Sequence, residues 1–444
     1  MRTTRIRRGT TRPGSIAASP HGGASHSRGA LALGALLASA ALTACAGGVG
    51  DAADDGASGG GYAWGADQAA IDEAIADLEP VELVFQASAT SPNSAIAESN
   101  IAYAEAIEEK SGGKISVEIL YGHPIAGYAE IYDALADGRV DVSYTNPAYN
   151  PDLFPAFDDL VSLTSNLPES PMAGELVAVA TLTEMAWNNE NIRADFEAEG
   201  LYPLVPVNPP GAYFSLCNTP GSTLADWQGR QVRVGSATHD KLVSAMGGTP
   251  VSLEYVETYE ALQRATIDCT MIVMSAALEQ GYMEVAPNLT YTGAGAIPRV
   301  FGSMLAGQKV ANLPLAYQQI VFDSWYDSHL LSLETIPTDN MRAVEEATAK
   351  GGKVEKLAPD AVAKVEENRQ ASLDEVQSGG LLGDDVQGTM DSTIEKWQST
   401  VAELGYEDGG ELTDMDAWFD PETFDSTPYV DRLYDDVISA HRPS

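Results

Sequence analysis

The chain has 444 residues, 44% of them hydrophobic and 7% aromatic, which is enough apolar material for two or three folded domains. Its formal net charge is −39, from 64 acidic and 25 basic residues. A surface of this sign stays soluble and repels a phosphate backbone. The composition therefore argues against nucleic acid as a partner.

Residues 1–44 differ from the rest, because they contain six arginines and no acidic residue. They end in the apolar run ALALGALLASAALTA at 30–44, which is shorter than the ~20 residues that a membrane-spanning helix needs. A basic flank, a short apolar core and a small-residue exit are typical of a secretory signal peptide. Its removal would leave 19 basic against 64 acidic residues, a net charge of −45.

The exit of this segment, LTAC at 42–45, resembles the lipobox of bacterial lipoproteins. In that class the cysteine thiol is lipidated and becomes the new N-terminus after cleavage. We therefore predict lipidation of Cys45, a membrane anchor through lipid only, and a location outside the cytoplasm. The alternative is an ordinary signal peptide with a chance cysteine, and the arginine pair at 7–8 leaves Sec and twin-arginine export both open.

Residues 45–79 begin with a run of Gly, Ala and Asp that predicts a flexible linker, with order starting near Pro80. Strand and helix patterns then alternate as far as residue 144. The expected elements are strands at 81–85, 115–120 and 140–144 and helices at 93–110 and 128–136. This order implies parallel strands joined by right-handed crossovers.

A second α/β pattern follows, and the C-terminal third is mostly helical. We expect strands at 213–217, 231–234, 251–253 and 267–274, and helices at 239–246, 258–265, 315–331, 339–349 and 360–377. Two α/β units with trailing helices predict an α/β protein with two lobes and a cleft. Ligands of such open sheets lie beyond the carboxyl ends of the strands.

Motifs of the common enzyme classes are absent, including His-Glu-x-x-His, Gly-x-Ser-x-Gly, the P-loop and the EF-hand loop. The four histidines after residue 44 are far apart in sequence and are expected at the surface or as caps. We predict no catalytic residue, no metal and no cofactor, and therefore a protein that is not an enzyme. A surface-anchored hydrolase is the least favoured alternative.

Two cysteines remain beside Cys45, namely Cys217 and Cys269. Outside the cytoplasm two thiols of one folded unit tend to oxidise. A disulfide across this separation would stabilise the fold by ~3–4 kcal/mol on the loop-entropy model. We favour the disulfide over two buried free thiols, and no neighbouring base suggests a cysteine nucleophile.

Several ordered stretches resemble the solute-binding proteins of TRAP transporters, the tripartite ATP-independent periplasmic transporters. The most recognisable is ETYEALQ at 257–263, followed by Ile267-Asp268. The others are EEKSGG with ISV at 108–117, AL-x-x-G-x-VD at 134–141, LADWQG-x-x-VRV at 224–234 and GGKV through LAPD at 351–360. Together they cover roughly residues 81–375.

The resemblance implies a periplasmic-binding-protein-like "Venus flytrap" with a long helix that spans both lobes. The implied organisation is a signal peptide at 1–44, an anchored linker at 45–79, lobe I at 80–207 and 294–330, lobe II at 208–293, and C-terminal helices packing across the lobes at 331–444. Such a protein captures an organic carboxylate and delivers it to integral-membrane TRAP permease subunits. The alternative is a binding protein of an ABC importer or a sensor kinase.

In this family an arginine grips the ligand carboxylate, and it falls on Arg233 here. A guanidinium matches a carboxylate with two parallel charge-assisted hydrogen bonds and does not lose its charge. A second basic position of well-known members falls near Tyr213. Where an asparagine often contacts the ligand, this chain has Ile272, and Cys269 replaces a glycine of the family turn.

These departures predict an apolar pocket lined by Tyr213, Ile272 and Met274. Polar groups of a heavily hydroxylated sugar acid would remain unpaired there, at ~1–3 kcal/mol each. We expect a monocarboxylate with an apolar or aromatic body, or a ligand outside the usual class. Further candidates for contact with the ligand stand at the ends of lobe I strands: Gln86, Tyr144 and Asn146.

Overall fold

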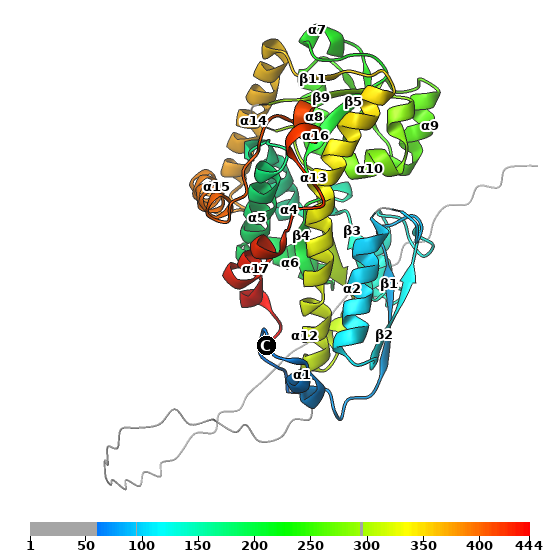
Figure 1. The fold of residues 1–444 in the computed structure, drawn as a ribbon, viewed down its shortest axis with the longest axis vertical. Helices are drawn as coiled ribbons and strands as arrows, with labels where there is room; N and C mark the ends of the chain where they lie inside the picture. Colours follow the sequence, from blue (N-terminus) through cyan, green and yellow to red (C-terminus); the bar gives the residue numbers. More distant parts are fainter. Residues whose placement is uncertain (1–59, 95, 294–295) are drawn as a thin grey trace, which may run out of the picture. The chain divides into compact units, whose positions relative to one another are not determined.

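A computed structural model describes residues 60–94, 96–293 and 296–444 of the chain. The predicted signal peptide, the lipidation site Cys45 and the first part of the predicted linker lie outside the described residues. Two sheets organise the described part, as Figure 1 shows. One has five strands in the order β2-β1-β3-β10-β4, and the other has six in the order β11-β9-β5-β8-β6-β7. We call the parts built on them lobe I and lobe II.

Lobe I begins with the predicted alternation of strand and helix. Its first elements are β1 (Val81–Gln86), α2 (Ala97–Lys110), β2 (Ile115–Leu120), α3 (Ile131–Ala136) and β3 (Val142–Thr145). β1 pairs in parallel with both β2 and β3, as expected. Gly112 and Gly113 follow α2 with φ of 58° and 77°, a conformation that glycine adopts without strain and that ends the helix.

Strands β10 and β4 complete the first sheet. β10 (Gly302–Ala306) lies between β3 and β4 (Tyr202–Asn208) and pairs antiparallel with each. The strand β10 was not predicted, and it joins the sheet from a distant part of the chain. The remaining elements of this region are η1 (Pro147–Tyr149), α4 (Pro155–Ser162), α5 (Ala173–Asn188), α6 (Glu190–Ala198), α11 (Gln308–Ala311) and α12 (Leu315–Asp323).

Lobe II carries a mixed sheet whose strands agree with most of the predicted ones. They are β5 (Tyr213–Cys217), β6 (Gln231–Val234), β7 (Thr249–Ser252), β8 (Cys269–Val273), β9 (Asn288–Tyr291) and β11 (Val354–Lys356). The helices between them are α7 (Leu224–Trp227), α8 (Ala237–Ala245), α9 (Thr258–Gln263) and α10 (Met274–Glu279). β11 comes from the C-terminal region predicted as helical, and it pairs in parallel with β9.

One long helix, α13 (Trp325–Ala349), contacts both lobes (yellow in Figure 1). It packs against α2 of lobe I and against β9 and α10 of lobe II. The prediction of separate helices at 315–331 and 339–349 was wrong, because α13 continues through Pro337. Proline removes the backbone donor that would serve the Leu333 carbonyl, and the helix nevertheless continues through this position.

The described part of residues 60–79 is ordered, which corrects the prediction that order begins near Pro80. It contains α1 (Gln68–Ala74), and the Tyr62 hydroxyl donates to Asp323 at 2.8 Å. The C-terminal tail reaches the same place, because Arg442 donates to both oxygens of Asp323 at 2.7 Å. The tail contains α14 (Pro359–Gly379), α15 (Val386–Glu403), α16 (Met415–Trp418) and α17 (Thr427–Asp436).

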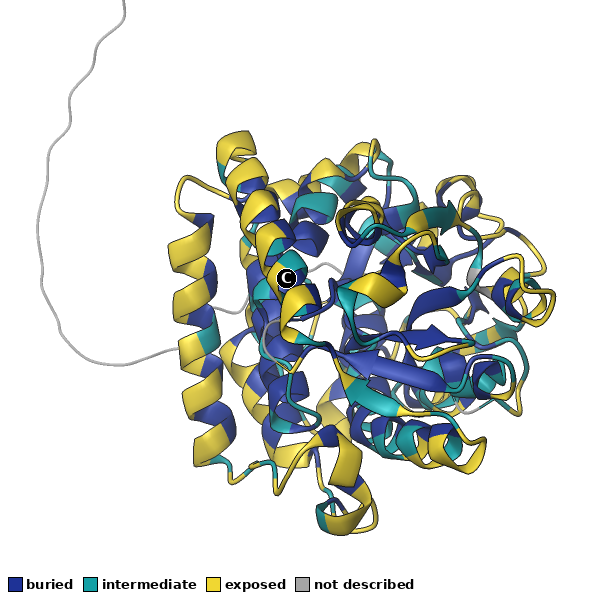
Figure 2. Ribbon diagram, turned by 90° about the horizontal axis from the view of Figure 1, so that it is seen from above, coloured by how far each residue is buried: buried dark blue, intermediate teal, exposed yellow. Residues whose placement is uncertain are grey.

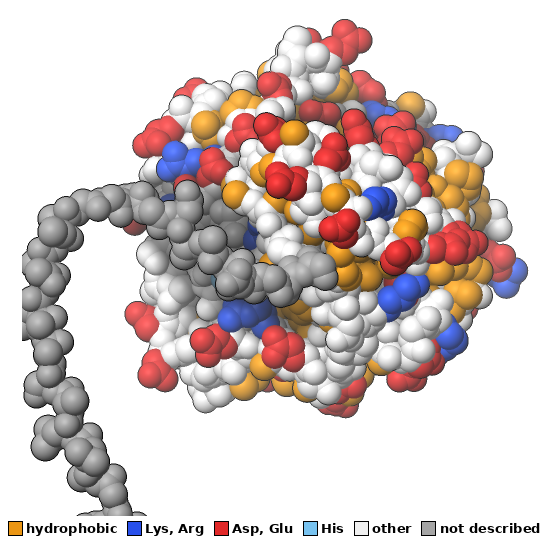
Figure 3. Space-filling model, turned by 90° about the horizontal axis from the view of Figure 1, so that it is seen from below, with side chains coloured by type: hydrophobic (Ala, Val, Ile, Leu, Met, Phe, Trp, Pro, Cys, Tyr) orange, Lys and Arg blue, Asp and Glu red, His pale blue; other side chains and the backbone are white. Residues whose placement is uncertain are grey.

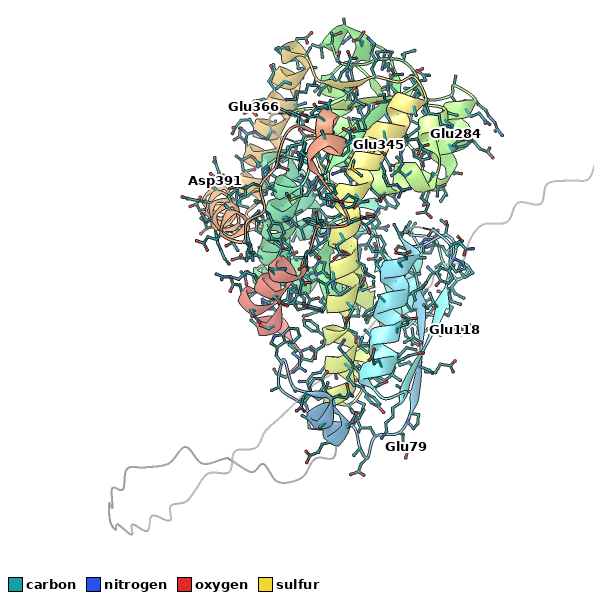
Figure 4. All side chains as sticks on the ribbon, in the orientation of Figure 1. Glu79, Glu118, Glu284, Glu345, Glu366 and Asp391 are labelled. Carbon is teal, nitrogen blue, oxygen red and sulfur yellow. A yellow bond between two sulfur atoms is a disulfide. The ribbon has the colours of Figure 1, made fainter. Side chains whose placement is uncertain are left out.

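Burial follows this arrangement. The strands are mostly buried, and the outer helices expose one face to solvent (Figure 2). The face drawn in Figure 3 carries acidic side chains spread among fewer basic ones, as the composition predicts. The acids labelled in Figure 4 belong to several elements and point outward, so much of the negative charge is solvated surface. No helix of the described residues is long and apolar enough to cross a membrane.

Candidate functional site

A cavity of about 180 Å³ is lined by residues of both lobes and of α13. Its volume limits an occupant to a small molecule. Aromatic and aliphatic side chains form much of the wall, with polar groups among them. The residues that line it include Ser88, Ile96, Asn100, Tyr128, Tyr144, Asn146, Tyr149, Tyr213, Arg233, Ile272, Val273, Glu279, Val300, Trp325, Ser332, Thr335 and Ile336.

Arg233 is the basic residue of this lining, and its position is fixed from three sides. It stands on β6 with only 2% of its surface exposed. Its Nε donates to the Leu253 carbonyl at 2.8 Å, and its Nη1 lies 3.4 Å from the Met271 carbonyl. Its Nη2 donates to the Tyr149 hydroxyl, from lobe I, at 3.1 Å. The guanidinium is therefore held in place beside the cavity before any ligand binds.

The charge of Arg233 is not neutralised by a local carboxylate. Among the residues that the structure describes, no Asp or Glu oxygen lies within 4.0 Å of a nitrogen of this side chain. A buried, unpaired cation is costly unless an anion is bound beside it. This site is therefore suited to an anionic ligand.

Neighbouring groups respond to this charge. Burial raises the pKa of the Tyr213 phenol well above its usual value, and the positive charge of Arg233 acts in the opposite direction. Burial also raises the pKa of Glu254, with Glu257 adding to the rise and Arg233 opposing it. His239 is buried, which lowers its pKa to about 4, so it is neutral near pH 7 and adds no second positive charge.

Tyrosines of lobe I form an aromatic wall of the cavity. The Tyr128 ring lies edge-on to Tyr144 and to Tyr149, with centroid distances of 6.2 and 6.0 Å. Tyr213 of lobe II packs against the His239 ring at 5.1 Å. Such rings present flat apolar surfaces to a ligand while keeping hydroxyl groups at their rims.

Five of the seven predicted contact residues line the cavity, namely Tyr144, Asn146, Tyr213, Arg233 and Ile272. Their contact with a ligand stays a prediction.

The other two predicted residues, Met274 and Gln86, do not line the cavity. β8 ends at Val273 and α10 begins at Met274, so the strand alternation stops and the methionine packs into the core. Gln86 is fully buried and holds a neighbouring loop, since it donates to the Ala126 carbonyl at 2.9 Å and accepts from the Ile125 amide at 3.2 Å.

The chain matches a known protein family. The family model of bacterial extracellular solute-binding proteins, family 7 (DctP), matches residues 86–379. The chain belongs to this family. A curated solute-binding protein of Verminephrobacter eiseniae is 20% identical over 250 residues, covering 56% of this chain and 72% of that protein.

Solved structures share the two-lobed fold of family 7. A TRAP solute-binding protein from Rhodoferax ferrireducens, in complex with copurified benzoate, has a TM-score of 0.62 and 18% identity, covering 72% of this chain and 99% of that one. The sugar acid binding protein DctPAm from Advenella mimigardefordensis, in complex with galactonate, has a TM-score of 0.61 and 19% identity, covering 72% and 100%. At these identities the likeness shows the fold alone.

The predicted disulfide is present in this family 7 protein, between Cys217 and Cys269. The two residues face each other across the antiparallel strands β5 and β8. They lie at the opposite end of this ladder from Tyr213, which pairs with Val273 at the cavity. The disulfide therefore braces the sheet of lobe II and does not line the site.

A buried ion pair fixes the connections between the lobes. Arg299, on the segment from β9 to β10, contacts Glu175 of α5 at 2.5 Å, and both side chains are almost fully buried. The other Glu175 oxygen accepts from the Ala212 amide at 3.0 Å, on the segment from β4 to β5. One carboxylate thus holds two of the crossovers that connect the sheets.

Several cavity residues were missed by sequence reasoning. Tyr128 stands in a turn, Tyr149 ends η1, Trp325 begins α13, and Glu279 ends α10. Nothing in their local patterns marks them, because loops and helix ends far apart in sequence meet only in the folded chain.

The prediction that the histidines lie at the surface or cap other elements was incomplete, since His239 and His329 are buried in the interior. Among the described residues, no group of three or more His, Cys, Asp or Glu side chains could hold a metal ion.

Proposed function

We propose that this protein captures a small organic monocarboxylate in the cavity between its lobes and delivers it to a TRAP-type permease. The observation that carries the proposal is Arg233, a buried cation held at the cavity wall without a carboxylate partner among the described residues. Its remaining donor capacity suits a carboxylate, which accepts charge-assisted hydrogen bonds from a guanidinium.

The rest of the wall favours a ligand with an aromatic or apolar body. Tyr128, Tyr144 and Tyr213 contribute aromatic residues to the lining, and Ile272 and Ile336 contribute aliphatic ones. A benzoate-bound relative and a galactonate-bound relative share the fold, so the fold alone permits both ligand types. The aromatic and aliphatic residues of this wall favour the first type, while its serine, asparagine and threonine residues could pair with polar substituents of the ligand.

The predicted lipid anchor at Cys45 would keep the protein outside the cytoplasm, beside its permease. It needs no cofactor in this role and catalyses no reaction. A binding protein of an ABC importer or of a sensor kinase would use the same cavity. Paired integral-membrane TRAP subunits encoded beside this gene would support the first role, and an ATPase or a kinase would support the second.

Isothermal titration calorimetry with a panel of acids tests the ligand class. We expect binding of one or more aryl or alkyl monocarboxylates and no comparable binding of polyhydroxylated sugar acids. Tight binding of galactonate together with no binding of aryl or alkyl acids would overturn the proposed class.

A further inference from the structure

A carboxylate of the protein itself lines the cavity that contains Arg233. Glu279 ends α10 and is half-buried. Among the described lining residues it is the acidic one, as Arg233 is the basic one. A ligand that offered only a carboxylate and an apolar body would leave Glu279 as an uncompensated negative charge in the same cavity.

The described contacts of Glu279 use only part of its capacity. Its Oε1 accepts a hydrogen bond from the Thr90 hydroxyl of lobe I at 2.6 Å. Its Oε2 has no hydrogen-bond or ion-pair partner among the residues that the structure describes, and no Lys, Arg or His of that part lies within 4.0 Å. A carboxylate has about four acceptor positions, so this side chain can receive a donor from a ligand.

A second unpaired acceptor lines the cavity. The Oδ1 atom of Asn146, which follows β3, is buried and has no hydrogen-bond partner. An unsatisfied buried acceptor costs free energy unless a ligand or water supplies a donor. Asn146 and Glu279 belong to different lobes, so both acceptors meet a ligand only in the shared cavity.

We propose that the ligand carries a hydrogen-bond-donating nitrogen, an ammonium group in particular, and that Glu279 receives it while Arg233 holds the carboxylate. The inference rests on the proposed function and narrows it to amino acids and related zwitterions with an apolar body. Net charge favours this class as well. The chain has a net charge of −39, which repels anions, whereas a zwitterion has no net charge.

The competing role of Glu279 is mechanical, as the partner of Thr90 in a contact between the lobes. That role predicts that removing the contact weakens binding of every ligand alike. A donor-binding role predicts a loss confined to ligands that carry the nitrogen. Matched ligand pairs therefore separate the two roles.

The test is calorimetric titration of the purified protein with pairs of equal skeleton, which differ only in the ammonium group. Suitable pairs are phenylalanine with 3-phenylpropanoate, leucine with 4-methylpentanoate, and 4-(aminomethyl)benzoate with 4-methylbenzoate. In at least one pair we expect the wild-type protein to bind the ammonium member ten-fold or more tightly. Glu279→Gln should remove this preference by weakening binding of the ammonium member without weakening binding of the other member.

Glu284→Gln is the matched control, because it removes the same charge from an exposed residue close in sequence (labelled in Figure 4). Thr90→Val removes the contact between the lobes and should leave the preference in place. Equal or weaker binding of the ammonium member in every pair overturns the inference but keeps the proposed function. Binding of no acid at all defeats both. The comparison on the wild-type protein decides the ligand class even if Glu279→Gln does not fold.

Discussion

The two lobes contribute to the cavity in different ways. Lobe II provides both of its charged lining residues, Arg233 from β6 and Glu279 from α10. Lobe I provides uncharged groups, among them Tyr144, Asn146 and Tyr149. Among the described residues, the charged groups of the lining thus belong to lobe II. Removing the charge of Arg233 should therefore weaken binding more than removing an uncharged lining group of lobe I.

The largest effect is expected where the two lobes are joined. Glu175→Ala leaves Arg299 buried without its partner and should lower the free energy of unfolding by ~3–5 kcal/mol. Urea unfolding followed by circular dichroism measures this. Glu197→Ala, at an exposed position of α6, is the control and should cost under about 0.5 kcal/mol. An equal cost for both variants would show that the junction does not depend on the ion pair.

Removing the disulfide tests whether this cross-link stabilises lobe II without affecting ligand binding. Replacing Cys217 and Cys269 together by serine should lower the free energy of unfolding by ~3–4 kcal/mol. Ligand affinity should change little in the folded variant, because the disulfide lies at the far end of the ladder from Tyr213. Unchanged stability would contradict a stabilising role of the disulfide. A large loss of affinity in folded protein would contradict its independence from the cavity.

The charge in lobe II has the largest expected effect on binding. Arg233→Ala should weaken binding of the best acid of the calorimetric panel by about 100-fold or more, since truncating one partner of a buried charge pair costs ~2–5 kcal/mol. Arg264→Gln removes an exposed arginine of the same lobe and is the control. A change of less than about three-fold in Arg233→Ala would remove this residue from the site.

The smallest effect is expected from the uncharged lobe. Tyr149→Phe removes the hydroxyl that accepts from Arg233 at 3.1 Å, and it should weaken binding by about 3–10-fold. Arg233 keeps its contacts with the Leu253 and Met271 carbonyls, so its position should persist. Titration calorimetry again gives the affinity. A loss as large as that of Arg233→Ala would mean that lobe I shares the recognition of charge.

Local patterns in the sequence predicted many strands and helices of both lobes, because the hydrophobic periodicity of each element depends only on residues that are neighbours in the sequence. The strand at 115–120 and the strand at 231–234 have the predicted bounds. β10 and β11 were missed because each joins its sheet from a distant part of the chain, and no local pattern marks such a pairing. The helix through Pro337 was missed because the surrounding packing outweighs the local preference of proline.

The site residues were predicted mainly from the resemblance to TRAP solute-binding proteins. Arg233 and Ile272 line the cavity, and their contact with a ligand stays a prediction, whereas Met274 does not line it, since β8 ends at Val273. Glu279 could not be selected from 64 acidic residues, because only the fold shows which of them lines the cavity with Arg233.

The most direct test of the central claim is native mass spectrometry of the folded protein with the small molecules that copurify. Capture by Arg233 predicts one bound carboxylate with an aromatic or apolar body, which is present in the wild-type protein and in Arg264→Gln and absent from folded Arg233→Ala. The same molecule retained by Arg233→Ala, or a bound molecule without a carboxylate, would contradict the account.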